Sequence, residues 1–282
     1  MTGGQDIAYR PRGRISGVRF GAHPSPGAGA LGAFRDHVPF MAYPDARRID
    51  VRATLRDPFG NTFVRRFQQR ASIDLYALVD LTGSLAYQGR ASKMELITAL
   101  CVALARSATR TGDRFGLIGC DAGVRPDCFI PATKRRGVAE EAAALLGRAR
   151  CKGASAAGLR QAGERLAGAR KMAFLISDFL LPLGLLREIF ESLAQHDVIP
   201  VIVGDASEDA DLPSLGLMEL ADLETGARRL VFMRPELKRR WLEAERERRA
   251  EIARLARQFG RTPVRIADVF DIDSFSRDLL QA

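Results

Sequence analysis

The pattern of apolar and polar positions changes near residue 71, and the pattern after that point predicts most of the fold. From there on, continuous apolar runs alternate with stretches whose apolar residues recur every three or four positions, the spacing of an amphipathic helix. The apolar runs predict strands at residues 73–80, 114–121, 124–130, 171–178, 198–205 and 228–233. The helical spacing predicts helices at 92–109, 135–150, 157–169, 183–196, 235–260 and 274–281. This alternation favours an α/β fold with a doubly wound, mostly parallel sheet covered by helices on both faces.

The residues before 71 follow a different pattern, so the chain is expected to divide into four parts. Residues 1–32 are rich in Gly, Pro and Arg with little periodicity, which indicates a flexible basic segment. Residues 33–71 alternate short extended pieces with turn signals, which predicts a small β-rich extension. An α/β domain is expected at 72–233. A C-terminal helical extension is expected at 234–282, where a long charged helix begins with Pro235.

The net charge of +9 is concentrated at the front of the chain. Residues 1–70 contain twelve Arg against five Asp and Glu. Such an excess suits nucleic acid, an acidic membrane surface or an acidic protein, and it equally suits an Arg-rich chain with no special partner. Few aromatic residues lie among these arginines, which argues against single-stranded nucleic acid.

Cysteine usage and hydropathy favour a cytoplasmic protein. The four cysteines form no C-x-x-C pair and have no histidine at zinc spacing, and such thiols stay reduced in the cytoplasm. The N-terminal stretch is polar and basic, unlike a signal peptide. The most apolar window, 172–190, contains Asp178 and Pro182, so we do not expect it to span a membrane.

The aspartates that end the first and the fourth predicted strands are the strongest functional signal. Asp80 ends the first strand and Asp178 the fourth. Ligands of open α/β sheets bind outside the carboxyl ends of the strands, so the two carboxylates are expected to converge. Hydroxyl groups follow at Thr82 and Ser84, and Ser155 precedes the helix that leads into the fourth strand. Such a set suits a hard divalent cation, because Mg²⁺ prefers oxygen ligands.

The same residues resemble a known signature. The stretch DLTGS is similar to the D-x-S-x-S motif of the metal-ion-dependent adhesion site (MIDAS) of von Willebrand factor A domains, with Thr82 keeping the hydroxyl of the usual first serine. Together with ALCVALARSATRTGDRFGLIGCD and FLISDF, it resembles the MoxR-associated bacterial proteins that carry such a domain. Upstream, YPDARRID resembles that family's Y-x-x-G-D-x-x-R-x-I-D-W segment, without its glycine and with Val51 in place of tryptophan. The resemblance covers residues 35–205.

The resemblance implies a binding protein rather than an enzyme. It implies metal contacts from Asp80, Thr82, Ser84 and Asp178, with Ser155 in the place of a threonine in the family's middle loop. The cation is expected to be Mg²⁺, or else Mn²⁺ or Ca²⁺, with an acidic side chain of a client protein completing its shell. The implied partner is a MoxR-type AAA+ ATPase, which acts with such proteins in chaperone-like maturation or assembly of client complexes. A further resemblance to the MxaS-like branch makes methanol dehydrogenase a candidate client.

Other interpretations of these residues stay open. The strand-end aspartates can cap the next helix or turn, Thr82 and Ser84 can be turn formers, and Ser155 can be a plain helix cap. A Mg-dependent phosphohydrolase of the haloacid dehalogenase type also has an aspartate after an apolar strand, but its mechanism needs a second acid where this chain has Thr82. An Arg-rich nucleic-acid-binding protein is the third alternative, with nucleic acid the less favoured partner.

Overall fold

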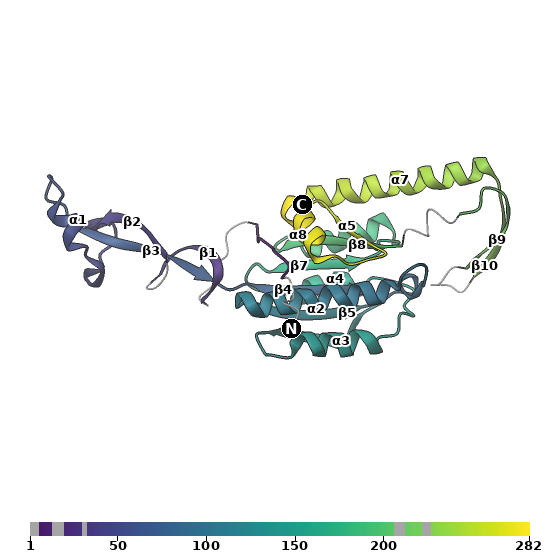
Figure 1. Ribbon diagram of the computed structural model, residues 1–282, viewed down its shortest axis with the longest axis horizontal. Helices are drawn as coiled ribbons and strands as arrows, with labels where there is room; N and C mark the ends of the chain where they lie inside the picture. Colours follow the sequence, from purple (N-terminus) through teal and green to yellow (C-terminus); the bar gives the residue numbers. More distant parts are fainter. Residues whose placement is uncertain (1–5, 13–19, 30–32, 206–211, 222–226) are drawn as a thin grey trace. The chain divides into compact units, whose positions relative to one another are not determined.

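The structure is a computed structural model that describes residues 6–12, 20–29, 33–205, 212–221 and 227–282 (Figure 1). It divides the chain into two compact units. One unit is Gly13–Ile73, which we call the N-terminal unit. The other consists of Met1–Arg12 and Asp74–Ala282, and we call it the sheet domain. The α/β pattern of the sequence therefore begins next to the boundary between the two units.

A six-stranded sheet in the order β11-β8-β7-β4-β5-β6 forms the centre of the sheet domain. Five of its strands are parallel to one another: β4 (Asp74–Asp80), β5 (Arg114–Cys120), β7 (Met172–Ser177), β8 (Asp197–Gly204) and β11 (Val264–Ala267). The edge strand β6 (Val124–Thr133) pairs antiparallel with β5. The central strands carry unbroken apolar runs because both of their faces are covered. The predicted α/β fold with a mostly parallel sheet is confirmed.

Helices cover the two faces of this sheet (Figure 1). One face carries α2 (Lys93–Thr111) and α3 (Val138–Arg148), which contact each other. The other carries α4 (Gly158–Arg165), α5 (Leu183–Ser192) and the last turns of α7 (Pro235–Gln258). The final helix, α8 (Ile272–Gln281), packs beside β11. None of the helices in the described ranges is long and apolar enough to cross a membrane.

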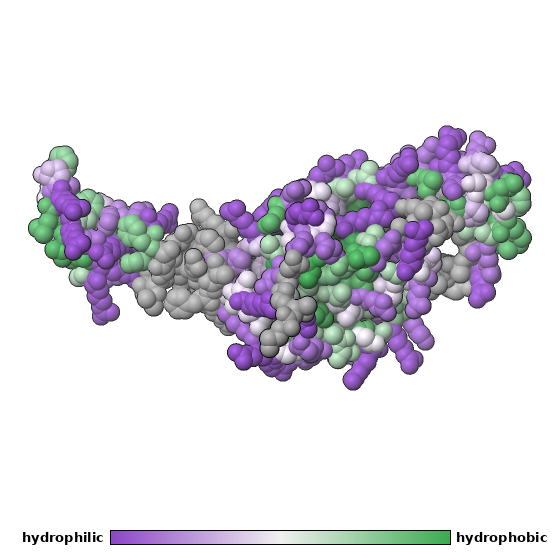
Figure 2. Space-filling view, in the orientation of Figure 1, coloured by the Kyte–Doolittle hydropathy of each residue, from purple (hydrophilic) through white to green (hydrophobic). Residues whose placement is uncertain are grey.

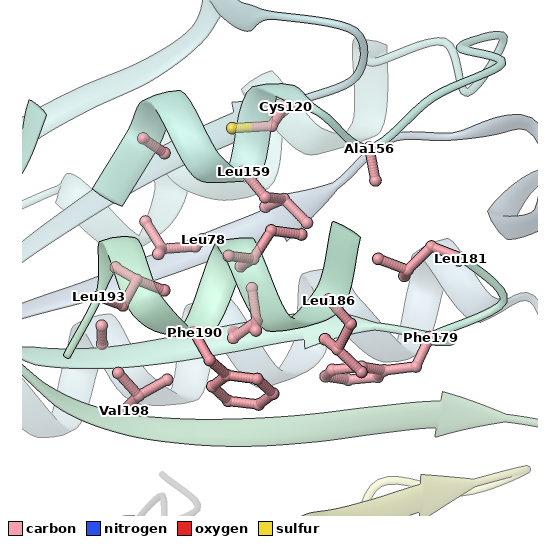
Figure 3. Packing of buried hydrophobic residues seen from close by; sticks show 14 of the residues in the cluster. Leu78, Cys120, Ala156, Leu159, Phe179, Leu181, Leu186, Phe190, Leu193 and Val198 are labelled. Atoms are coloured by element: carbon pink, nitrogen blue, oxygen red, sulfur yellow. The ribbon is translucent and has the colours of Figure 1, made fainter. Parts of the chain in front are cut away.

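The core on the second face is one cluster of buried apolar side chains (Figure 3). Leu78 and Leu175 enter it from the neighbouring strands β4 and β7, and Phe190 enters it from α5. Phe190 also stacks on Phe259, with 5.2 Å between the ring centroids. Phe179 belongs to the same cluster although it lies in the loop after β7. Burial of a large side chain stabilises by roughly 1.5–3 kcal/mol, so this core holds the loop in which Asp178 lies.

Residues 234–282, which were predicted as a C-terminal helical extension of the α/β domain, belong to the same compact unit as the sheet, so the predicted domain boundary at 233 is wrong. β11 extends the main sheet by pairing in parallel with β8. The last turns of α7 bury Ile252, Leu255 and Ala256 in the core described above. The sequence pattern did not predict the contact between α7 and the core, because α7 is charged along most of its length and its buried residues lie only near its end.

The late strand predicted at 228–233 is present as β10 (Arg228–Met233), but it does not join the main sheet. It pairs antiparallel with β9 (Gly216–Ala221) in a separate two-stranded sheet, with Leu217 opposite Phe232. Leu217 is 62% exposed and Phe232 is 50% exposed. Apolar residues therefore gather on the surface of this hairpin, as Figure 2 shows. An apolar run in the sequence does not distinguish such a hairpin from a central strand.

Residues 6–12 pack against the sheet domain, although the sequence predicted a flexible segment over 1–32. Ile7 is buried, and its N–H donates to Ser107 Oγ at 2.8 Å. The N–H of Arg12 donates to Asp197 Oδ2 at 2.6 Å. The prediction is therefore wrong for residues 6–12. Its parts at 1–5, 13–19 and 30–32 lie outside the described residues.

The N-terminal unit contains a three-stranded antiparallel sheet in the order β1-β3-β2. Its elements are β1 (Phe20–Gly29), β2 (Ala33–Pro39), two 3-10 turns (Phe40–Ala42 and Ala46–Arg48), α1 (Val51–Leu55) and β3 (Phe63–Ala71). A β-rich extension was predicted from residue 33 onwards. The sheet begins earlier, with β1, because the Gly and Pro residues that suggested a flexible segment lie within an edge strand.

Acidic residues of the N-terminal unit form ion pairs with its arginines. Asp50 is the N-cap of α1 and also accepts hydrogen bonds from Arg65 Nε at 2.6 Å and from His37 Nε2 at 2.9 Å. The hydrogen bond from Arg65 is the largest cause that holds the pKa of Asp50 well below its usual range. Asp45 pairs with Arg48 at 2.9 Å in the same segment. The stretch YPDARRID therefore forms a structural cluster that links α1 to β3.

We expect the ion pair between Asp197 and Arg261 to be a main support of the sheet domain. Arg261 donates Nε to Oδ1 at 3.0 Å and Nη2 to Oδ2 at 2.8 Å, and both side chains are 5% exposed. Arg261→Ala leaves a buried carboxylate without its cation, so the free energy of unfolding should fall by about 3–5 kcal/mol in urea denaturation.

The matched control for this prediction is Arg106→Ala. It breaks an ion pair with Glu140 at 3.3 Å in which the two side chains are 59% and 65% exposed. Water screens such a pair, so the control should change stability little. If the two variants unfold at the same urea concentration, the support does not come from the buried pair.

Candidate functional site

The carboxyl ends of β4 and β7 bring together the two aspartates that the sequence singled out. The strands are paired in parallel with Val79 opposite Ile176, so Asp80 and Asp178 reach the same edge of the sheet. Both line one pocket of about 180 Å³, together with Thr82 and Ser155. The expected convergence of the two carboxylates is therefore observed.

Asp80 is buried, and both of its carboxylate oxygens accept hydrogen bonds. Oδ1 accepts from the N–H of Thr82 at 2.9 Å, and Oδ2 accepts from Ser177 Oγ at 2.7 Å. Burial is the largest influence on this group and raises the pKa of Asp80 to about 6. The two hydrogen bonds oppose this shift, and the charge of Asp178 adds to it. The carboxylate is held in one orientation at an energetic cost to the fold.

Thr82 and Ser84 lie in the turn that follows β4. Thr82 precedes the 3-10 turn Gly83–Ala86, and its Oγ1 lies 3.2 Å from Ser84 Oγ. Thr82 is only 2% exposed and lines the pocket directly. Ser84 is not among the residues that line the pocket, and it contacts Thr82 through this hydrogen bond. Both residues belong to this turn, although Thr82 makes no side-chain hydrogen bond that caps it.

Ser155 lies in the loop before α4, which packs against the turn after β4. The N–H of Gly83 donates to the carbonyl of Gly153 at 2.9 Å and ties the two loops together. Ser155 Oγ accepts from the N–H of Ala157 at 3.2 Å, so the residue also supports the start of α4. A Cβ on Gly158 would lie 2.4 Å from the backbone of Gly123, so this loop can approach β6 only with glycine there. The serine that lines the pocket is thereby fixed in place.

Asp178 is paired with a buried lysine that the sequence analysis did not single out. Lys93 Nζ lies 3.2 Å from Asp178 Oδ2, and the two side chains are 1% and 4% exposed. The N–H of Leu180 donates to Asp178 Oδ1 at 3.2 Å. Lys93 is the first residue of α2 and lies on the side that faces the sheet. A lysine on the apolar face of a helix was the available signal, because lysine is almost never fully buried unless it is paired.

Two further residues hold the loop after β7. Ser177 Oγ accepts from the N–H of Phe179 at 2.9 Å while it donates to Asp80. Phe179 has a φ of 58°, a left-handed conformation that non-glycine residues adopt only under constraint. Arg248 of α7 supplies that constraint, because its Nη2 donates to the carbonyls of Phe179 at 2.7 Å and Leu181 at 2.5 Å. The helix that the sequence placed in a C-terminal extension therefore contacts the loop that carries Asp178.

The residues present fit a hard divalent cation. All polar side chains that line the pocket carry oxygen: Asp80, Thr82, Ser155 and Asp178. The hydroxyls of Thr82 and Ser155 keep lone pairs beyond the hydrogen bonds described above. Oxygen ligands of this kind suit Mg²⁺ or Ca²⁺ better than a softer metal. The ligand roles themselves stay a prediction.

Burial of the Asp80 charge generates a test of stability against pH. A carboxyl whose pKa is higher in the folded chain than its ordinary 3.8 destabilises the fold above pH about 6 and ceases to do so as the pH falls towards about 4. Asp80→Asn removes the charge but keeps the shape. It should therefore raise the free energy of unfolding of the metal-free protein at neutral pH by up to about 3 kcal/mol. This gain should vanish by pH about 4 in thermal melts.

Asp127→Asn is the control, because the pKa of Asp127 is shifted in the opposite direction from that of Asp80. Arg125 Nη2 lies 2.6 Å from Asp127 Oδ2, and the hydrogen bond from Arg125 is the largest cause that lowers the pKa of Asp127. Neutralising this exposed carboxylate should give no gain at neutral pH and at most a slight loss. A neutral-pH loss of stability in Asp80→Asn would show that the hydrogen bonds of Asp80 outweigh its burial.

Comparison with known proteins places this geometry in a family. The family model described as "Protein of unknown function DUF58" matches residues 39–251. An uncharacterized protein of Mycobacterium tuberculosis is 28% identical over 261 residues, which cover 88% of this chain and 78% of that protein. A Paracoccus denitrificans protein described as "Uncharacterized protein in moxR 3'region" is 37% identical over 97 residues, which cover 34% of this chain and 92% of that protein.

Among solved structures, the hypothetical protein BatB from Bacteroides thetaiotaomicron resembles this chain with a TM-score of 0.47 and 16% identity. The match covers 74% of this chain and 98% of BatB. The DUF58 match includes β3 of the N-terminal unit and the strands β4 and β7 that carry the pocket. With most of its length matched by that model, the chain belongs to the DUF58 family.

Proposed function

We propose that this protein is a non-enzymatic, metal-dependent protein-binding module that resembles von Willebrand factor A domains. One observation carries the proposal: two buried carboxylates, Asp80 and Asp178, converge with hydroxyl groups in one pocket at the carboxyl ends of adjacent parallel strands. This is the edge at which open α/β sheets bind their ligands. Of the residues that resemble the D-x-S-x-S part of the MIDAS motif, Asp80 and Thr82 line this pocket, and Ser84 is hydrogen-bonded to Thr82.

The charges around the pocket support capture of an acidic group. Asp80 and Asp178 contribute two negative charges when ionised, and Lys93 contributes one positive charge. A bound Mg²⁺ changes this balance from net negative to net positive. Because the side chains are largely removed from water, the positive charge is poorly screened and attracts a carboxylate of a partner. The hydroxyls of Thr82 and Ser155 position the cation without cancelling its charge.

The proposed partner is a MoxR-type AAA+ ATPase, with which the protein acts in maturation or assembly of a client complex. The relative from Paracoccus denitrificans is described by its position in a moxR 3' region, and this supports the proposal. The MxaS-like resemblance of the sequence keeps methanol dehydrogenase as a candidate client. In this proposal, the client or the ATPase supplies the acidic side chain.

The phosphohydrolase alternative is less favoured by the contacts of Asp80. In such an enzyme this aspartate attacks the phosphorus atom, and an acid two residues later moves the proton. Here both oxygens of Asp80 accept hydrogen bonds from within the fold, and position 82 carries a hydroxyl. The other carboxylate that lines the pocket, Asp178, is already paired with Lys93.

The nucleic-acid alternative is weakened by the way the N-terminal arginines are used. Arg48, Arg65 and Arg66 are already paired with Asp45, Asp50 and Asp36, respectively. Such contacts leave less of the positive charge for phosphates. The proposal of an acidic partner therefore rests on the pocket and not on the positive charge of residues 1–70.

Metal binding can be tested with Mn²⁺ by calorimetric titration. Wild-type protein is expected to bind one Mn²⁺, and its thermal stability should rise with the logarithm of the Mn²⁺ concentration once that concentration exceeds Kd. Thr82→Ala removes one hydroxyl from the pocket and should weaken the binding by about tenfold or more. Association with a purified MoxR-type ATPase should fall on addition of EDTA.

The matched control for Thr82→Ala is Thr98→Ala. The Thr98 hydroxyl donates to the Met94 carbonyl within α2 at 2.7 Å and does not line the pocket. This variant should bind Mn²⁺ as wild type does. Absence of Mn²⁺ binding at millimolar concentrations, or equal loss in both variants, contradicts the proposed metal site.

A further inference from the structure

A second pocket, of about 220 Å³, adjoins the pocket that contains Asp80. The two pockets share Asp178 and Leu180 in their walls, so one extended segment can reach both. The second pocket lies between α7, the carboxyl end of β8 and the start of β11. Neither the family description nor the MIDAS resemblance assigns it a role.

Much of the lining of this second pocket is apolar and rigid. Ile202 and Val203 come from β8, and Ile252 and Ala253 come from α7. Val203 is 1% exposed and Ile252 is 3% exposed, so both are fixed in the core and are not free to fill the space. A dry cavity of about 150 Å³ with aliphatic walls holds a benzene molecule. The second pocket is therefore large enough for a leucine or phenylalanine side chain.

The rim of the pocket carries an excess of positive charge. Arg248, Arg249 and Arg265 line it, and the acids there are Glu245 and Asp178. Asp178 is already neutralised by Lys93. The Nε of Arg248 is buried and has no hydrogen-bond partner within the described residues, although its Nη2 holds the loop after β7. A ligand with a carboxylate close to its apolar group complements this arrangement.

We propose that the second pocket binds an apolar side chain, of leucine or phenylalanine size, that is flanked by acidic residues in an extended segment of the partner protein. The arginine rim attracts one flanking carboxylate, and another reaches the cation at Asp80 and Asp178. This inference deepens the proposed function and rests on it for the second carboxylate only. The apolar contact and the arginine contact need no metal.

Three synthetic tripeptides, Ac-Glu-Phe-Glu-NH₂, Ac-Glu-Ala-Glu-NH₂ and Ac-Gln-Phe-Gln-NH₂, separate these contributions. Each is titrated in EDTA into protein with labelled Ile, Leu and Val methyl groups, and NMR follows the methyl signals of Ile202, Val203 and Ile252. The first peptide should shift these signals with a Kd about tenfold lower than the other two, because only it supplies both the apolar group and the charge.

Variants of the protein locate the contact. Arg265→Glu reverses one charge of the rim, and Ala253→Phe fills the pocket from α7. Each should weaken Ac-Glu-Phe-Glu-NH₂ about tenfold or more. Arg246→Glu makes the same charge change on the exposed side of α7, outside the pocket, and should leave the Kd unchanged. Thermal melts check that all three variants fold, and the two pocket variants test the site independently of each other.

Each outcome of these titrations has a defined meaning. If the three peptides bind equally, or if Arg265→Glu and Arg246→Glu behave alike, the second pocket is not the site and the inference fails. If the first peptide binds in EDTA as expected and added Mg²⁺ does not tighten it, the second pocket stands and the metal-dependent function fails. If Mg²⁺ tightens it about tenfold, both proposals are supported.

Discussion

The hydrogen bond from Ser177 Oγ to Asp80 Oδ2 is the interaction on which the site depends. It crosses from β7 to β4 at the point where both strands end, at 2.7 Å, and it exists because the two strands are paired in parallel register. The same Ser177 oxygen accepts the N–H of Phe179 and so begins the loop that carries Asp178. One buried hydroxyl thereby fixes the orientation of one carboxylate and the path of the loop that carries the other.

The ends of the chain strengthen this arrangement from two directions. Asp197, at the start of β8, receives Arg261 from the connection between α7 and β11, and it also receives the backbone N–H of Arg12. Arg248 of α7 holds the carbonyls of the loop after β7. The segment of α7 and the connection after it therefore contacts both ends of the strands, through Arg261 at the start of β8 and through Arg248 at the loop after β7. A shift of α7 would also shift Asp178, because only a few hydrogen bonds separate the two.

The sequence predicted the elements of the sheet domain because their apolar periodicity is strong and local. It also predicted that Asp80 and Asp178 meet, because the ends of parallel strands share one edge. It did not predict the burial of Lys93 or the role of Arg248, because the partner of each lies far away in the chain. β11 was missed for a related reason: its four residues are too few for a periodic pattern, and its pairing with β8 is decided by the tertiary fold.

The ammonium group of Lys93 changes what a metal has to do at this site. Two carboxylates in one buried pocket repel each other, and in a site without an internal cation a bound metal would be needed to hold them together. Here the counter-ion of Asp178 is part of the chain itself, because Lys93 Nζ lies 3.2 Å from its carboxylate. Asp80 is held by two hydrogen bonds. The geometry of the pocket is therefore maintained by the fold itself. Under the proposed function, a divalent ion would find oxygen ligands already oriented, and its binding energy would be available for attracting a partner instead of for ordering the loops.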